Sequence, residues 1–202
     1  MTAMNGGPVR VVVGISGASG AVYGVRVLDA LGELGVESHL VISRAAALTL
    51  AQETELTPAD LAARATVTYR PAEVGAAISS GSFRTLGMIV APCSVRTMSE
   101  IATGVTSSLL SRAADVTLKE RRPLVLMVRE TPLHLGHLRT LTQLAEMGAT
   151  IAPPLPAFYA RPESLEQLVD QSVGRALDLL GLSWAPTRRW QGLAVPGGGD
   201  EA

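Results

Sequence analysis

Residues 10–35 read RVVVGISGASGAVYGVRVLDALGELG, and this stretch predicts a β-strand, a glycine turn and a helix in that order. The first six residues form a β-branched run that ends in glycines, as strands in α/β proteins often do. The part that follows Gly20 carries an apolar residue at every third position from Val25 to Leu34, which is a helical spacing. A strand, a tight turn and a helix in succession form the first unit of an α/β fold.

The rest of the chain repeats this alternation of strands and helices. Further strands are expected at 36–42, 66–69, 87–91, 124–128 and 149–152. Helices are expected at 44–52 and 58–65, from near Thr97, at 109–120, from an N-cap at Thr131 with Pro132 as first helical residue to Gly148, and at 163–180. The runs GMIVA and LVLMV are continuously apolar, which is typical of central parallel strands covered on both faces.

These elements predict an α/β protein with a single domain. Its architecture should be a doubly wound, Rossmann- or flavodoxin-like parallel sheet flanked by helices. The domain is expected to span residues 10–182, between a disordered N-terminus at 1–9 and a C-terminal tail at 183–202 that ends in PGGGDEA. A length of 202 residues fits one hydrophobic core.

The composition narrows the classes of function. A net charge of -1 gives no basic face, so binding to nucleic acid is not expected. No apolar run approaches the ~20 residues of a membrane helix, so no membrane span is expected either. The start of the chain lacks a secretory signal and Cys93 is its only cysteine, which together predict a cytoplasmic protein without disulfides. A hydrophobic content of 47% favours self-association.

Small and hydroxyl-bearing residues follow the predicted strands, where ligands bind in open α/β sheets. They are Ser16 to Gly20 after the first strand, Ser43 after the second, Pro92 to Thr97 after GMIVA, and Arg129 with Glu130 after LVLMV. Hydroxyls and free backbone N–H groups at helix starts attract anions, so the expected ligand carries a phosphate.

Several phosphate ligands are disfavoured by the motifs. GISGASG is not the G-x-G-x-x-G dinucleotide fingerprint, and Ser43-Arg44 stands where an NAD site needs an acidic residue, although Arg44 leaves room for NADP. The only lysine, Lys119, has Asp115 four residues before it, so the Tyr-x-x-x-Lys pair of short-chain dehydrogenases is absent. No P-loop occurs. FMN, with one phosphate and a ribityl chain, fits the serine-rich loops better.

A set of longer motifs resembles one family over roughly residues 10–182. The motifs are GISGASGAVYG, ISRAA, SGSF, APCSVRT, RAADVTLKERRPLVLMVRETPLHLGHL, PAFYARP and DQSVGRALDLLG. Together they resemble the UbiX-type flavin prenyltransferases. The resemblance implies transfer of a dimethylallyl group from dimethylallyl monophosphate to N5 and C6 of reduced FMN, which gives prenylated FMN for a UbiD-type decarboxylase. It also implies a homododecamer in which neighbouring subunits complete each site.

The resemblance also assigns roles to individual residues. Residues that match flavin contacts are Gly17, Ala18, Ser19, Ser43, Ser94, Val95, Arg96, Thr97 and Arg129. Residues that match ligands of the prenyl phosphate are Tyr159 and Arg175, with Arg112 and Lys119 as further cations. Glu53 and Glu130 match carboxylates that handle protons. No metal is implied, because fixed cations can stabilise the leaving phosphate. Some family members carry tryptophan near the position of Val74. The resemblance therefore does not assign the residue that lines the prenyl pocket at this position.

Simpler roles compete for several of these residues. Cys93 after a buried strand is more often a packed hydrophobe than a nucleophile, and Ser19 could be a helix cap. His134 and His137 lie three apart on a predicted helix without a third metal ligand, and His39 lies in a strand, so structural roles are expected. Arg121 and Arg122 are expected in a solvated or interface cluster, and Arg175 could form a surface ion pair.

Two other functions compete with prenyl transfer. An FMN-dependent cysteine decarboxylase has a related fold, but it needs a PASANT-like segment where APCSVRT stands, and an active-site histidine. A non-catalytic flavin-binding subunit of a decarboxylase would not need the expected cluster of cations and carboxylates.

Overall fold

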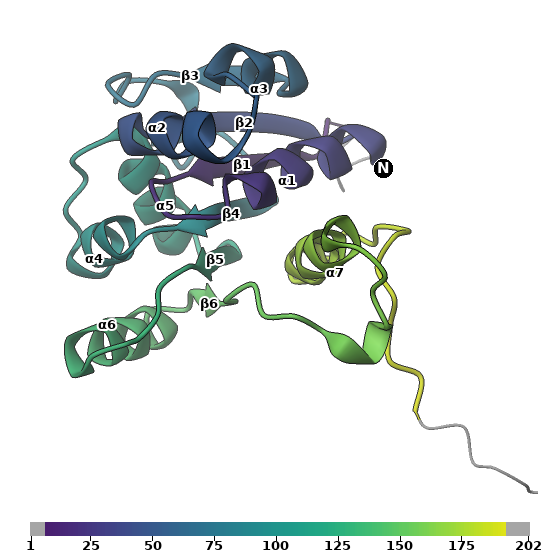
Figure 1. Ribbon diagram of the computed structural model, residues 1–202. Coiled ribbons are helices and arrows are strands. Elements are labelled where there is room, and N and C mark those ends of the chain that lie inside the picture. The colour runs from purple at the N-terminus through teal and green to yellow at the C-terminus, as the bar shows by residue number, and fades with distance from the viewer. Residues whose placement is uncertain (1–6, 193–202) are drawn as a thin grey trace, which may run out of the picture.

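The computed structural model describes residues 7–192 and contains a six-stranded parallel sheet in the order β3-β2-β1-β4-β5-β6 (Figure 1). The strands are β1 (Arg10–Ile15), β2 (Glu37–Ile42), β3 (Val67–Tyr69), β4 (Gly87–Cys93), β5 (Leu124–Val128) and β6 (Thr150–Ile151). The chain winds outward in one direction from β1 and in the other from β4. The predicted doubly wound α/β sheet is therefore confirmed.

Helices cover both faces of the sheet and enclose two hydrophobic cores. The helices are α1 (Ala21–Glu33), α2 (Arg44–Glu53), α3 (Pro58–Arg64), α4 (Val95–Thr103), α5 (Leu109–Lys119), α6 (Leu135–Glu146) and α7 (Leu165–Asp178). Side chains of β1 alternate between the faces, because Val11 and Val13 pack in the core under α1 and α7, whereas Val12 packs in the core under α4, α5 and α6. Consequently α5 and α7 lie on opposite faces.

The order of the strands reverses between β1 and β4, and this is the point where open α/β sheets bind ligands. The loops that leave these two strands are joined through one buried serine. Ser16 donates its hydroxyl to the Pro92 carbonyl at 2.9 Å and accepts the Ser94 N–H at 2.7 Å. The carboxyl ends of β1 and β4 thus form one rigid base for a site.

The predicted start of α6 at Thr131 and Pro132 is wrong. The helix begins at Leu135, because the side chain of His134 is its N-cap and its Nδ1 accepts the N–H groups of Gly136 at 3.0 Å and His137 at 3.3 Å. The Thr131–Pro132 peptide bond is cis. Because His134 is the cap and precedes the helix, His134 and His137 are not two positions of one helical turn. Their rings stack with centroids 3.6 Å apart.

The packed chain continues beyond residue 182, where the domain was expected to end. Trp184 is 2% exposed and donates its indole N–H to Glu33 at 2.7 Å. Gln171 on α7 accepts the Arg188 N–H and donates to the Arg188 carbonyl. Of the N-terminus at 1–9 that was expected to be disordered, residues 1–6 lie outside the described residues, but Val9 packs against the core and its carbonyl accepts the Glu37 N–H at 2.9 Å. The terminal PGGGDEA also lies outside the described residues. Within residues 7–192, no helix is long and apolar enough to cross a membrane.

Candidate functional site

Three loops at the carboxyl edge of the sheet line one cavity of about 200 Å³. Among its lining residues are Gly17 after β1, Ser43 after β2, and Ser94, Arg96 and Thr97 after β4. Five of the nine residues expected to contact a flavin therefore meet in one place, as the strand-end argument predicts.

Two helices begin at this cavity. Ser43 is the N-cap of α2, where its hydroxyl accepts the Ala46 N–H at 3.1 Å, and Ser94 is the N-cap of α4, where its hydroxyl accepts the Thr97 N–H at 3.3 Å. The first turns of both helices direct unpaired backbone N–H groups and the positive ends of their dipoles toward the cavity. This arrangement suits a phosphate monoester, and the hydroxyls suit a polyol chain.

Gly17 allows the first loop to touch the first turn of α2. A Cβ atom at this position would lie 2.3 Å from Cβ of Ala45, so any larger residue would push the loop and the helix apart. The glycine therefore keeps the backbone of the loop within the cavity, where a ligand can approach it closely.

The cavity also contains residues that the strand-end argument does not find. They are Arg44, Ala45, Pro71, Glu100, Ser107, Ser108 and Leu110. Ser108 is the N-cap of α5, so a third helix start opens here, and the serine pair preceding that helix is the signal that could have found it. Glu100 holds Arg96 in an ion pair of 2.9 Å, although the Arg96 side chain is 83% exposed.

Glu53 is the last residue of α2, and its side chain reaches the start of α1, directly after the first loop. Its carboxylate accepts the N–H groups of Gly20 at 2.8 Å and Ala21 at 2.9 Å. Burial acts to raise the pKa of Glu53, but the hydrogen bonds from Ala21, Ser19 and Gly20 and the positive charge of Arg129 outweigh it, so its pKa is lowered. Glu53 is therefore an ionised cap of α1, and Ser19 contacts it instead of capping the helix.

We expect Glu53→Gln to destabilise the protein at pH 7 by less than about 1 kcal/mol, since exposure screens the lost charge. The pKa of Glu53 is lowered on folding. Its contribution is therefore complete above the unfolded pKa of about 4.3, and it disappears as the pH falls through the lower folded pKa. Thermal unfolding of the variant and of wild type should differ at pH 7 and converge once the pH has fallen below the folded pKa of Glu53. Glu55→Gln, an exposed neighbour, is the control, and an unchanged difference at low pH would contradict the role.

Arg129 and Glu130 follow β5 at the same edge of the sheet. The Arg129 N–H binds the Cys93 carbonyl at 3.0 Å, which fixes this backbone beside the end of β4. Both side chains are exposed, and within residues 7–192 the Glu130 carboxylate accepts only the N–H of Thr131. A carboxylate with such access can exchange protons with a bound substrate.

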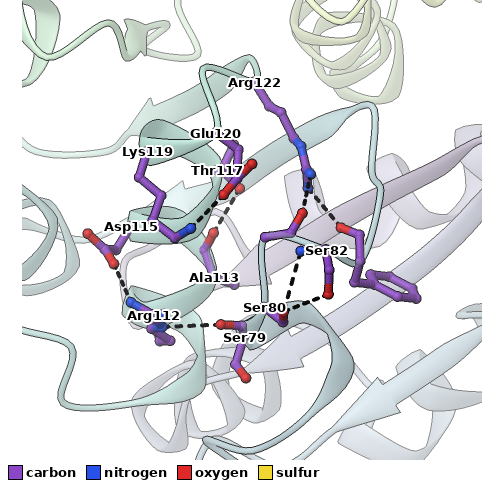
Figure 2. A network of polar contacts seen from close by, with 12 residues as sticks. Ser79, Ser80, Ser82, Arg112, Ala113, Asp115, Thr117, Lys119, Glu120 and Arg122 are labelled. Atoms are coloured by element: carbon purple, nitrogen blue, oxygen red, sulfur yellow. Dashed lines mark hydrogen bonds and ion pairs between the residues drawn. The ribbon is translucent and has the colours of Figure 1, made fainter.

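The two expected cations on α5 lie at different ends of this helix, because Arg112 is two residues after the cavity residue Leu110, whereas Lys119 is the last residue. Arg112 pairs with Asp115 at 2.6 Å, and Lys119 pairs with Glu120 at 2.5 Å (Figure 2). Lys119 is the last residue of α5, about 13 Å along the helix axis from Leu110, which lines the cavity. Lys119 is therefore near the amino edge of the sheet and not beside the flavin loops of its own chain.

Tyr159 and Arg175 lie on the opposite face of the sheet from α5. Tyr159, in the 3-10 turn η2 (Phe158–Ala160), accepts the Gln171 side-chain N–H at 3.1 Å. Arg175 on α7 forms an exposed ion pair with Asp178 at 2.6 Å, as the simpler hypothesis expects. One chain thus separates the expected phosphate ligands onto two faces of the sheet, and none of the four lines the cavity.

Most residues for which a structural role competes with a catalytic or metal-binding role make contacts that are typical of structural residues. Cys93 is completely buried, and this burial raises the pKa of its thiol to about 12, which leaves no thiolate for catalysis. His39 contacts the Tyr69 hydroxyl through Nδ1 at 3.0 Å. No group of three possible metal ligands occurs in residues 7–192. Val74 is 56% exposed, outside the cavity.

Arg122 differs from the expected solvated cluster. It is half-buried, and its guanidinium donates to the carbonyls of Gly81 at 2.6 Å and Phe83 at 2.8 Å. Arg121 is exposed, with a φ of 55°. Only one of the two adjacent arginines therefore behaves as a surface charge.

Comparison with known proteins identifies close relatives over nearly the whole chain. A family model described as flavoprotein matches residues 2–177. The flavin prenyltransferase UbiX of Escherichia coli strain K12 is 55% identical over 186 residues, which cover 91% of this chain and 98% of the relative.

Solved structures of UbiX-type proteins also match this chain. AnUbiX in complex with FMN and dimethylallyl pyrophosphate matches with a TM-score of 0.91 and 48% identity, over 93% of this chain and 100% of that chain. A dodecameric FMN-dependent UbiX-like decarboxylase from Escherichia coli O157:H7 matches with a TM-score of 0.88 and 48% identity, over 91% and 100%. The FMN-dependent cysteine decarboxylase TvaF shares only the fold, at 17% identity and a TM-score of 0.63 over 87% of this chain and 100% of that chain.

Proposed function

Because this chain belongs to the flavoprotein family and, within it, to the UbiX-type flavin prenyltransferases, we infer that it is an FMN-dependent prenyltransferase. The reaction moves a dimethylallyl group from dimethylallyl monophosphate to N5 and C6 of reduced FMN and releases phosphate. The observation that supports it within the chain is the cavity where α2 and α4 begin, because its serines and helix starts fit the ribityl phosphate of FMN. A cysteine decarboxylase has support only from the shared fold.

The flavin is proposed to lie along the three loops of the carboxyl edge. Ser94 and Thr97 would hold its phosphate at the start of α4, with Val95 and Arg96 beside them, and Ser43 would contact the ribityl chain. Gly17, Ala18 and Ser19 would border the ring, which Arg129 approaches from β5. Reduced FMN, when bound, supplies the electron-rich ring atoms that accept the allyl group.

Fixed cations are proposed to drive loss of the phosphate. Cleavage of the allylic C–O bond leaves both electrons on the phosphate oxygen, and the growing negative charge is stabilised by Arg112, Lys119 and Arg175. Arginine orients a phosphate through two parallel hydrogen bonds, whereas lysine acts as a point charge. Tyr159 would add a neutral hydrogen bond. These side chains replace a metal ion in the proposed mechanism.

The two carboxylates are proposed to have different tasks. Glu130 is exposed and has one hydrogen-bond donor, so it is free to accept a proton that leaves the flavin ring. Glu53 accepts two backbone N–H groups and has a lowered pKa, which makes it a weak base. We propose that it stays ionised and fixes the first flavin loop at the start of α1.

Each site is proposed to draw on several copies of the chain. The flavin loops, Lys119 and the pair Tyr159 and Arg175 lie at three separate places in one chain. A dodecameric relative provides a precedent for the homododecamer expected from the sequence. Neighbouring subunits could then bring the three groups together. A UbiD-type decarboxylase as recipient of the product and a cytoplasmic location remain predictions from the sequence.

We expect the protein, kept anaerobic with reduced FMN and dimethylallyl monophosphate, to produce a flavin heavier by one C5 unit. Mass spectrometry of the released flavin measures this directly. A parallel reaction with dimethylallyl diphosphate distinguishes the two donors. Binding of FMN and of both donors is measured separately, so unmodified flavin from a protein that binds them would refute the proposed function.

A further inference from the structure

The segment Ser79–Phe83, which connects η1 (Ala77–Ser79) to β4, packs against the end of α5. A Cβ atom on Gly81 would lie 2.0 Å from Oε1 of Glu120 and 2.9 Å from Nζ of Lys119. The backbone of Gly81 is therefore in direct contact with the Lys119–Glu120 ion pair. Any outward movement of this segment would remove the support on which the lysine side chain rests.

Two arginines hold the segment in this position through its carbonyl groups. Arg122 donates to Gly81 and Phe83, and Arg112 donates to the Ser79 carbonyl at 3.3 Å (Figure 2). The guanidinium of Arg122 is half-buried and planar, so it binds both carbonyls at fixed separation. Charged hydrogen bonds of this kind are stronger than neutral ones, and their loss would leave two carbonyls without these donors.

We propose that Arg122 is a positioning residue for prenyl-phosphate binding, which fixes the Ser79–Phe83 segment against Lys119. The inference rests on the proposed function, in which Lys119 is a cation of the phosphate site. Arg122 acts through the backbone of Gly81 and needs no contact with the substrate. The guanidinium of its neighbour Arg121 makes no hydrogen bond or ion pair within the described chain, which provides a control of identical chemistry at the adjacent position.

The test compares Arg122→Met with Arg121→Met in the full-length protein. Arg122→Met should accelerate hydrogen exchange of the backbone amides in residues 80–86 and raise the KM for dimethylallyl monophosphate about tenfold. FMN affinity should stay unchanged, because the flavin loops are at the other edge of the sheet. Arg121→Met should match wild type in all three measurements.

The measurements test separately whether Arg122 holds the Ser79–Phe83 segment and whether the protein prenylates FMN. The proposed role of Arg122 is wrong if residues 80–86 of Arg122→Met exchange hydrogen at the wild-type rate, or if the KM of this variant for dimethylallyl monophosphate is unchanged. Should wild type fail to prenylate FMN, the proposed function fails while hydrogen exchange still decides whether Arg122 holds the segment. If Arg122→Met does not fold, Arg122→Lys is tested instead, because it keeps the charge but loses the planar guanidinium that binds two carbonyls. The backbone amides of residues 80–86 should exchange hydrogen faster in this variant than in wild type.

Discussion

Glu130→Gln should bind FMN as wild type does and lose about 100-fold to 1000-fold in kcat, the range that a general base contributes. The amide keeps the shape of the side chain and its contact with the Thr131 N–H, but it cannot take up a proton. The backbone at this position is fixed by the bond between the Arg129 N–H and Cys93. The substitution should therefore change proton transfer without changing the site's geometry.

Single-turnover kinetics under anaerobic conditions measure the loss, with FMN affinity determined by fluorescence titration. Glu146→Gln, an exposed glutamate at the end of α6, is the control and should keep wild-type kcat. Residual activity of Glu130→Gln should depend on added phosphate if the released phosphate can replace the carboxylate as base. Full activity in this variant at every phosphate concentration would remove Glu130 from the mechanism.

The sequence predicts the sheet well because its strands carry their own evidence. GMIVA and LVLMV are apolar at every position, which requires burial on both faces, and they are the inner strands β4 and β5. The loops that follow the strands could also be placed from the sequence, since all parallel strands end at the same edge of the sheet. For the same reason Gly17, Ser43 and Ser94 were expected together, and they line one cavity.

Features that depend on particular side-chain contacts could not be predicted in this way. The start of α6 was misplaced because Thr131-Pro132 fits the usual helix start, whereas the cap is an imidazole nitrogen of His134. The tail has no periodicity, yet Trp184 packs in the core with residues of α1 and α7 and donates a hydrogen bond to Glu33. Arg122 resembles Arg121 in sequence, and only the nearby carbonyls of Gly81 and Phe83 distinguish them.

The distribution of the expected site over one chain has a consequence that can be tested by mixing variants. Glu130 lies at the carboxyl edge of the sheet, and Lys119 at the end of α5 lies near the amino edge. Lys119→Met should lose about 100-fold or more in kcat, because the leaving phosphate loses a fixed cation. In a symmetric oligomer, however, the Lys119 that serves a flavin would belong to a neighbouring copy.

Co-assembly of Lys119→Met chains with Glu130→Gln chains should therefore restore activity. If chains mix at random, about a quarter of the sites combine an intact Glu130 from one chain with an intact Lys119 from another. Neither parent has such a site. A site built within one chain would stay inactive in every mixture, because no chain carries both residues, so failure of co-assembled oligomers to regain activity would contradict the shared site. Mixing Lys119→Met with a chain carrying both substitutions is the inactive control, since every Lys119 is then replaced.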